Sequence, residues 1–475
     1  MAQALAPVSA LLIAIALLVT GHGLQSTLIP LAGSQAGFSD LEIGLVSSSY
    51  FIGLVLGCLG APYVIMRAGH IRAFAALVSL MSAAAILHPI MVEPLAWSAI
   101  RVISGFCLAG FYMIVESWLN EQASNENRGT IMSIYIVLVY AAMTAGQLSL
   151  TVMDIATFIP FAIASVTVSL AVIPVSLTTA NQPAPITVVR FRPVKLYRNS
   201  PTALVAVLMI GITQGALWML TPLYAIQIGL TTSQAAYFAA AFVGAGALSQ
   251  WPIGRLSDRL DRRLVLLGLA ASAVVVSIVF MTVPINGFAM AIALVLLAGI
   301  ATQPAYAIAA SHAFDHADRS DYVETSSGMN LAFGIGSSFG PLTAAYLMQS
   351  VGSWGLFLQV AVIQALMGLY ILSRLFQRAA PSIEEKTDFD YAASAQVGTV
   401  LSPEPLDLED PSVIPPEEFP AYDHVSDDLT GAAAAAIGEE YLTPAMSAES
   451  AAESSAGPEA RIAERGAPAA ETRAD

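Results

Sequence analysis

Charged side chains are scarce in this chain: they make up 11 % of its 475 residues, whereas soluble globular proteins carry about 25 %. An excess of basic residues is also lacking, because the formal net charge is −15. A nucleic-acid-binding protein needs a basic face to meet phosphates, so the composition excludes that class and a compact secreted domain as well. Cysteine is nearly absent, and Cys58 and Cys107 both lie in apolar runs, which does not favour a disulfide framework.

Apolar residues are abundant instead, at 56 % of the chain, and acidic charge is concentrated at one end. Residues 1–378 hold 15 basic and 13 acidic side chains, whereas residues 379–475 hold 4 and 21. The acidic end is rich in Ala, Pro, Glu and Ser, and such a segment buries too little apolar surface to offset the entropy lost on ordering. We predict an apolar body followed by a disordered acidic tail.

Twelve apolar stretches of the body are each long enough to cross a bilayer as a helix, which takes about 20 residues. A helix satisfies its own backbone polar groups where no water is present. The first stretch is too long for the apolar region of a cleaved signal peptide, so we interpret it as a retained span. The twelve lie near residues 8–31, 42–65, 72–91, 95–119, 129–153, 156–178, 202–225, 233–254, 263–284, 287–311, 324–349 and 354–376.

Basic residues indicate the orientation of these spans, because Lys and Arg are enriched in cytoplasmic loops. Fourteen of the fifteen basic residues of the body fall in loops on one side of the predicted membrane. The loops on the other side hold acids such as Asp40, Glu42, Glu93 and Asp154. Both termini are therefore predicted to lie in the cytoplasm. The one exception, Arg101, lies inside the fourth span.

The longest connection in the body separates the sixth span from the seventh and is rich in Pro, Asn and basic side chains. We therefore predict an all-α integral membrane protein with twelve transmembrane helices in two pseudo-symmetric six-helix bundles. The first bundle is assigned to residues 1–180, a cytoplasmic linker to 181–200, the second bundle to 201–378, and the cytoplasmic tail to 379–475.

A basic motif follows the second span of each half. The loop from Gly254 to Arg263 has the sequence GRLSDRLDRR, and the loop that begins at Pro62 has the sequence PYVIMRAGHIR. The former resembles the signature loop of the major facilitator superfamily, Gly-x-Leu-x-Asp-Arg-x-Gly-Arg-Arg, with Asp261 in place of the second glycine. The fourth span adds Arg-x-x-x-Gly from Arg101, which is similar to the superfamily's arginine motif. The Gly-Pro pair of drug antiporters is absent from the fifth span.

A second set of motifs is distributed over both halves of the body. The motifs are SSSY at 47–50, ESWLNE at 116–121, NRG at 127–129, GQL at 146–148, QWPIGR at 250–255 and HAFD at 312–315. As a set they resemble the YcaD-like group of bacterial facilitator-type transporters. The resemblance extends over residues 8–375 and implies a twelve-helix transporter, whereas the tail has no counterpart in that group.

Two ionisable residues of the fourth span are candidates for function, because such residues are costly inside a membrane. Arg101 can bind a substrate carboxylate with its planar guanidinium or alter the pKa of a nearby acid; alternatively, its stem is buried while its head reaches an interface. Glu116 lies fifteen residues later, about 22 Å along the helix. It either exchanges protons at the cytoplasmic mouth or accepts hydrogen bonds from the loop and pairs with Arg128.

Polar residues of the first and seventh spans are candidates for a ligand cavity, since the resemblance implies that these two spans line it. His22 and Gln25 share one helix face, and Gln214 and Trp218 share another. Polar and aromatic groups together can orient a ligand; the alternative is hydrogen bonding between helices. Further candidates are Gln147, Gln303, Tyr306 and Asn330.

The loop after the eighth span is a candidate for control of conformation. Asp258 can face the positive N-terminus of the eleventh span, and the resemblance implies that this loop is a latch that stabilises the outward-open state. The predicted latch residues are Gly254, Asp258, Arg259, Arg262, Arg263, Arg67 and Gly69.

The sequence contains neither a Gly-rich phosphate loop nor Cys and His clusters at metal spacing, so we predict no enzyme and no cofactor. We predict a monomeric, multi-pass secondary active transporter of the inner (plasma) membrane that moves a small solute by alternating access, coupled to protons. Two alternatives stay open: a non-transporting sensor or scaffold that uses the acidic tail, and a passive facilitator. The tail is expected to contact the basic cytoplasmic rim or a cytoplasmic protein.

Overall fold

The computed structural model describes residues 8–123, 127–178, 183, 193–317 and 322–376, which all belong to one compact unit. These residues are almost entirely helical, and no strand occurs among them. Most of the linker predicted at 181–200 and the whole tail predicted at 379–475 lie outside the described residues.

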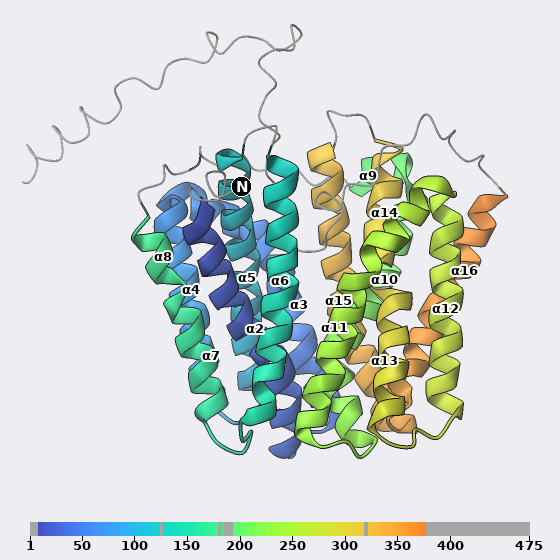
Figure 1. The fold of residues 1–475 in the computed structure, drawn as a ribbon, viewed down its shortest axis with the longest axis horizontal. Coiled ribbons are helices and arrows are strands. Elements are labelled where there is room, and N and C mark those ends of the chain that lie inside the picture. The colour runs from blue at the N-terminus through green and yellow to red at the C-terminus, as the bar shows by residue number, and fades with distance from the viewer. Residues whose placement is uncertain (1–7, 124–126, 179–182, 184–192, 318–321, 377–475) are drawn as a thin grey trace, which may run out of the picture. The chain divides into compact units, whose positions relative to one another are not determined.

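Long helices build the N-terminal half (Figure 1). In this half α3 packs against α5, α2 against α6 and α4 against α7. The helices are α2 (Ser9–Gln35), α3 (Asp40–Ala68), α4 (His70–Leu87), α5 (Pro94–Gln122), α6 (Arg128–Ser149) with the one-turn η2 (Leu150–Val152), and α7 (Ile159–Leu170), which α8 (Val172–Ser176) continues.

The C-terminal half repeats this pattern after the short helix α9 (Pro193–Asn199). Here α11 packs against α13, α10 against α15, and α12 against α16, which are the same pairs by order along the chain. The helices are α10 (Pro201–Gln227), α11 (Thr232–Arg259), α12 (Arg262–Thr282), α13 (Phe288–Thr302), α14 (Ala305–Phe314), α15 (Tyr322–Val351) and α16 (Gly355–Leu375).

Eleven helical segments of the described chain are long and apolar enough to cross a membrane. They correspond to eleven of the twelve predicted stretches. The remaining stretch, predicted at 233–254, is α11, which has 28 residues but carries polar side chains such as Gln250 and Asp258. Because α11 packs against α6, α10 and α13, part of its polar surface is sheltered from lipid. The count of twelve spans and the side on which the termini lie stay predictions.

The helices α3 and α11 begin with the same local chemistry. A glycine with positive φ turns the chain just before each of them, Gly37 at 85° and Gly229 at 89°, a conformation that glycine adopts without steric cost. Ser39 and Thr231 then form capping boxes with the third residue of the helix, which satisfy backbone N–H groups at the helix start. The two halves therefore share a capped helix start in addition to the basic motif at the other end of the same helix.

Small residues allow the closest helix pairs to pack. A Cβ atom on Gly53 of α3 would collide with the backbone oxygen of Val102 in α5, and one on Gly146 of α6 with that of Thr20 in α2. Close backbone approach of this kind is how helices pack in a membrane, where lipid is as apolar as the side chains. The glycines are therefore required for the observed spacing of these pairs.

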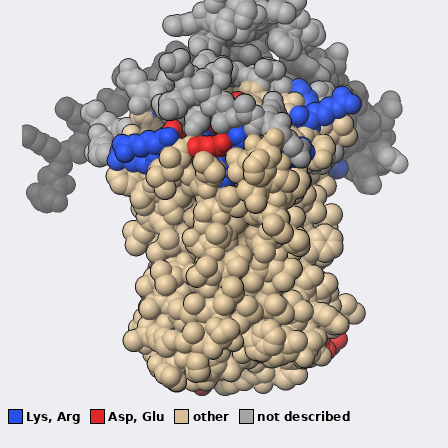
Figure 2. All heavy atoms as spheres, turned by 90° about the vertical axis from the view of Figure 1, so that its right-hand side faces the viewer, with Lys and Arg blue, Asp and Glu red and all other residues tan. Residues whose placement is uncertain are grey.

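Basic residues gather at one end of the helices, as Figure 2 shows, and we call this the basic end. The broad surface between the two ends is free of charged side chains in this view, as expected for a surface that faces lipid. The described residues that define the basic end are Arg67, Arg72, Arg128, Lys195, Arg198, Arg255, Arg259, Arg262, Arg263 and Arg374.

The two halves contact each other near the opposite end, in a region that we call the seal. Gly44 of α3 lies directly against α15 at Pro341 and Ala345. Four hydrogen bonds join the halves in the seal: Leu41 N–H to Gln349 Oε1 at 3.2 Å, Gln227 Nε2 to Asp40 Oδ1 at 2.8 Å, Ser233 Oγ to the Thr151 carbonyl at 3.0 Å, and Leu342 N–H to Ser48 Oγ at 3.0 Å.

Candidate functional site

A cavity lies between the two halves, with walls from α2, α3, α5 and α6 on one side and from α10, α11 and α15 on the other. Its volume is about 120 Å³, enough for several water molecules. The wall is mainly apolar and aromatic. The aromatic and sulfur-containing lining residues are Tyr50, Phe51, Cys58, Tyr112, Tyr140, Met143, Trp218, Met219 and Phe333.

Polar side chains of the wall are held in place by neighbouring helices. His22 Nε2 lies 3.3 Å from the hydroxyl of Tyr50, and the two rings stack. The Nε2 group of Gln250 donates to the Tyr140 hydroxyl at 2.7 Å, which joins α11 to α6 across the two halves. Among the described residues, His22 Nδ1 and Trp218 Nε1 find no partner. A ligand or water in the cavity can satisfy these two groups.

Four of the nine residues predicted for the cavity or for coupling line its wall, and five lie behind it. The four are His22, Gln147, Trp218 and Asn330; the five are Gln25, Arg101, Gln214, Gln303 and Tyr306.

Gln214 stabilises a break in the helix that faces it. Pro304 has no N–H and interrupts the helix between α13 and α14. The amide nitrogen of Gln214 donates to the carbonyl of Thr302 at 2.8 Å and to that of Gln303 at 3.3 Å. A polar residue in the middle of α10 therefore donates hydrogen bonds to the backbone carbonyls beside the helix break.

The other residues behind the wall are fully buried. Tyr306 supports the cavity from outside, because its hydroxyl donates to Asn330 Oδ1 at 2.6 Å. Gln303 lies against Gly246, where a Cβ atom would collide with it. The side-chain amides of Gln25 and Gln303 have no partner in the described part of the chain.

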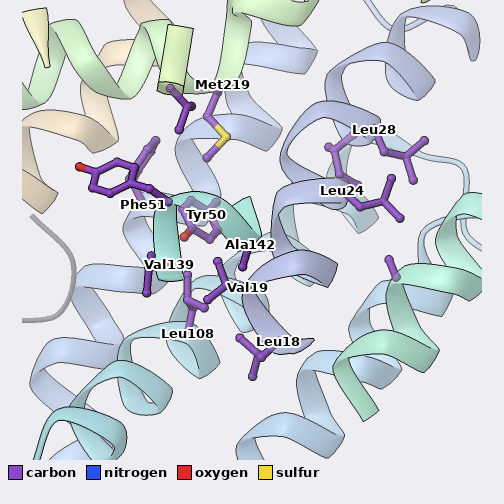
Figure 3. Close-up of a cluster of buried hydrophobic side chains, with 14 of the residues drawn as sticks. Leu18, Val19, Leu24, Leu28, Tyr50, Phe51, Leu108, Val139, Ala142 and Met219 are labelled. Atoms are coloured by element: carbon purple, nitrogen blue, oxygen red, sulfur yellow. The ribbon is translucent and has the colours of Figure 1, made fainter. Parts of the chain in front are cut away.

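Arg101 lies one side chain away from the cavity and is 1 % exposed. Its guanidinium carbon is 4.4 Å from the centre of the Tyr50 ring, and its Nη2 atom is 3.8 Å from the sulfur of Met219. Tyr50 and Met219 both line the cavity, and Figure 3 shows them in one buried cluster with residues of α2, α5 and α6. Arg101 therefore contacts one cavity-lining residue from each half, Tyr50 and Met219.

Glu116 is 2 % exposed and lies toward the basic end of α5. Its Oε1 atom accepts a hydrogen bond from the hydroxyl of Tyr135 at 2.8 Å. Arg128, which we expected as a partner in the structural interpretation of Glu116, donates from Nε to Asn120 Oδ1 at 3.1 Å. The carboxylate is thus held between α5 and α6.

Three predicted latch residues of the C-terminal half, Asp258, Arg262 and Arg263, form ion pairs at the basic end. Asp258 lies 3.8 Å from Arg262 one turn later in the chain, and Arg262 Nε lies 2.8 Å from Asp315 at the end of α14. Gly254 and Arg259 belong to the last two turns of α11. The Arg262–Asp315 pair connects the start of α12 to the end of α14 within one half.

The contacts of Asp261 give a structural reason for an aspartate where the superfamily motif has its second glycine. It is the N-cap of α12, where its carboxylate accepts the backbone N–H of Arg263, and it also pairs with the Arg263 guanidinium at 2.8 Å. Partial burial opposes ionisation, but the hydrogen bonds from Arg263 outweigh this and hold the pKa of the Asp261 carboxyl below its usual value. The matching loop of the first half turns at Gly69 with a φ of 77°, directly after Arg67 and Ala68.

The sequence analysis missed the tyrosines of the wall and Met219. Tyr50, Tyr112 and Tyr140 are compatible with an apolar span, so hydropathy did not distinguish them from lipid-facing residues. The SSSY motif at 47–50 contained Tyr50 but gave it no role. Within the residues that the structure describes, no three His, Cys, Asp or Glu side chains are grouped to hold a metal ion.

The profile of the Major Facilitator Superfamily matches residues 11–317, and a second match covers residues 203–406. A protein of Salmonella arizonae called "Uncharacterized MFS-type transporter YcaD" is 29 % identical over 377 residues, which is 79 % of this chain and 97 % of that protein. A protein of the same description from Salmonella typhi is 29 % identical over 385 residues, with the same coverage.

Solved structures share the fold at low sequence identity. A bacterial homologue of the human lysosomal transporter Spinster, in an inward-facing and occupied conformation, has a TM-score of 0.66 at 16 % identity over 79 % of this chain and 98 % of that one. The nucleoside transporter NupG has a TM-score of 0.67 at 13 % identity over 79 % and 100 %. The Escherichia coli fucose:proton symporter FucP has 0.52 at 14 % identity over 78 % and 99 %.

These matches extend over both halves and agree with the paired helix packing and the multi-pass arrangement of the described residues. The chain belongs to the Major Facilitator Superfamily, as a membrane transporter of its YcaD-like group.

Proposed function

We propose that this protein is a secondary active transporter that moves a small solute across the inner (plasma) membrane by alternating access, with protons as the coupling ion. The observation that carries the proposal is the cavity whose wall comes from both halves. Because the halves meet around it, a change in their angle transfers access from one end of the helices to the other.

The basic end is assigned to the cytoplasm, in agreement with the positive-inside rule. We count α11 as a span, which gives twelve crossings in two bundles of six, at residues 1–180 and 201–378. The hydrogen bonds of the seal then lie on the external side. This arrangement supports an inward-facing state, in which the solute exchanges with the cytoplasm.

Substrate binding is assigned to the polar residues of the wall, with His22, Gln147, Trp218 and Asn330 as first candidates. Proton coupling is assigned to the cavity and to Glu116, because a buried carboxylate that accepts a tyrosine hydroxyl can gain and lose a proton as its surroundings open. The latch residues are assigned to the balance between conformations. We expect a monomer, since each chain contains a whole cavity.

Transport by the purified full chain in sealed vesicles tests the proposal. A thermal-shift screen against metabolites and toxic compounds first identifies ligands, because a ligand that prefers the folded state raises its apparent stability. Each ligand is then offered to vesicles with and without an imposed proton gradient. We expect accumulation that disappears when the gradient is dissipated. Uptake that only equilibrates would indicate a passive facilitator, and binding without any uptake would contradict transport.

Deletion of residues 379–475 separates the proposal from the scaffold alternative. A transporter without its tail is expected to keep its flux, because the whole cavity lies within the described helices. Loss of the cellular phenotype with unchanged flux in vesicles would assign that phenotype to the tail.

A further inference from the structure

Arg101 differs from the other fully buried arginines in the charge around it. Arg262 and Arg263 are 1 % and 4 % exposed, and each lies 2.8 Å from an aspartate. Arg101 is as deeply buried, but among the described residues its Nε and Nη1 atoms have no hydrogen-bond partner. Its contacts are the ring of Tyr50 and the sulfur of Met219. In the described part of the chain, the contacts of Arg101 thus include no anionic oxygen.

A buried guanidinium without a neighbouring anionic oxygen is stabilised when an anion binds to it. It stays protonated at any physiological pH and offers five N–H donors in a planar fork. That fork matches the two oxygens of a carboxylate, whereas a thioether is a weak acceptor and an aromatic ring compensates only part of the charge. A buried charge is rarely left in this condition unless another group completes it.

The position of Arg101 allows a solute to supply that group. Tyr50 and Met219 line the cavity and touch the guanidinium, so a single layer of side chains separates it from the solute. Arg101 and Tyr50 belong to the N-terminal half, and Met219 belongs to α10 of the C-terminal half. Separation of the halves at the seal would therefore withdraw Met219 and uncover the guanidinium. Methionine is flexible enough to move aside within one state as well.

The other residues of the cavity wall indicate the chemical character of the rest of the solute. No Asp or Glu is among the described lining residues, so a cationic solute finds no counter-charge there. Trp218 and Phe333 stand in edge-to-face contact on the wall, and the few polar groups include His22 and Asn330. A sugar-like solute needs many hydrogen-bonding groups, whereas this wall suits an apolar or aromatic body with few of them.

We propose that the cavity binds an organic monocarboxylate with an apolar body, and that Arg101 holds the carboxylate in place of Met219. This inference rests on the proposed transport function and names the class of its substrate. Arg101 is thereby the residue that determines specificity for charge, and Met219 is the group that covers it when no solute is bound.

Matched pairs of acids and amides test the inference by equilibrium binding to the purified full chain. The probes are benzoate with benzamide and hexanoate with hexanamide. Binding is followed by tryptophan fluorescence, since Trp218 lines the cavity, and independently by thermal shift. We expect at least one acid to bind about tenfold or more tightly than its amide, the effect of losing a charge-assisted hydrogen bond.

Substitutions then assign the preference to one residue. In Arg101→Gln the preference for the acid should disappear, and in Arg101→Lys, which keeps the charge without the planar fork, it should fall. Arg72→Gln, at an exposed arginine of the basic end, is the matched control and should leave it unchanged. The inference is overturned if no acid binds more tightly than its amide, or if the preference survives in Arg101→Gln. If amides bind and are transported equally well, the transport proposal stands and only the assignment of the anion falls.

Discussion

Replacing Arg101 by methionine should raise the free energy of unfolding in the absence of solute, although the substitution removes the contact of the buried guanidinium with the Tyr50 ring. Two guanidinium nitrogens, Nε and Nη1, have no hydrogen-bond partner in the described residues, and each such buried polar group costs about 1–3 kcal/mol. The stacking on Tyr50 at 4.4 Å opposes this, with a gain of about 2 kcal/mol for a desolvated pair. The difference in the free energy of unfolding is about 0–4 kcal/mol in favour of Arg101→Met, and its midpoint of about 2 kcal/mol corresponds to a rise in Tm of about 2 °C for a body of this size.

Thermal unfolding of the detergent-solubilised full chain, followed by tryptophan fluorescence, measures this change. Arg262→Met is the matched control: it removes an equally buried arginine, but one that lies 2.8 Å from Asp315. Breaking a buried pair costs about 3–5 kcal/mol, so the control should lower the Tm by several degrees. If Arg101→Met lowers the Tm as much as the control does, then Arg101 is a structural residue and the argument from its missing anion is refuted.

Three further predictions concern the latch, the N-cap of α12 and the helix contacts. Asp258→Asn should impair transport or shift the balance of conformations while membrane insertion stays intact; wild-type flux together with unchanged state-selective labelling would contradict the latch assignment. The lowered pKa of Asp261 means that its ionised form stabilises the fold above the unfolded carboxyl's pKa of about 4, and that this contribution is lost as the pH falls through the folded value. Asp261→Asn should therefore lower the free energy of unfolding at pH 7 by less than about 1 kcal/mol, because the group is partly exposed. A Tm difference between wild type and variant that stays constant down to pH 3 would contradict this cause. Gly146→Ala should cost about 1–3 kcal/mol through its collision with α2, whereas Gly244→Ala, which meets open space, should be neutral or stabilising; equal Tm values for the two variants would contradict the packing argument.

The spans could be predicted from two signals, the length of each apolar stretch and the side on which the basic residues lie. Both signals follow from the physical chemistry of a bilayer. Eleven of the predicted stretches coincide with apolar helices of the structure. The signal is weakest for α11, where polar side chains such as Gln250 and Asp258 lower the mean hydropathy. Gln250 donates to Tyr140 of the other half, a contact between residues 110 positions apart in the chain. No local pattern carries that information.

The candidate site was predictable only in part, because a polar residue on a buried helix face has several possible surroundings. His22 and Trp218 line the cavity, whereas Gln214, four residues before Trp218, satisfies carbonyls beside Pro304. Helical periodicity assigns Gln214 and Trp218 to the same face and cannot separate these roles. The contact of Arg101 with Met219 depends on how the two halves meet, which the sequence of either half does not determine.

Accessibility of a single cysteine in the cavity tests alternating access most directly, since it needs no known substrate. The two native cysteines, Cys58 and Cys107, are replaced by alanine, and Val243→Cys places a thiol on the wall of the cavity. Val152→Cys and Leu177→Cys, which are 86 % and 77 % exposed at opposite ends, report which side a membrane-impermeant reagent has reached. Each control should react from one side only, and Val243→Cys should react from both. Reaction of Val243→Cys from the cytoplasmic side alone, under every condition of solute and proton gradient, would contradict the account.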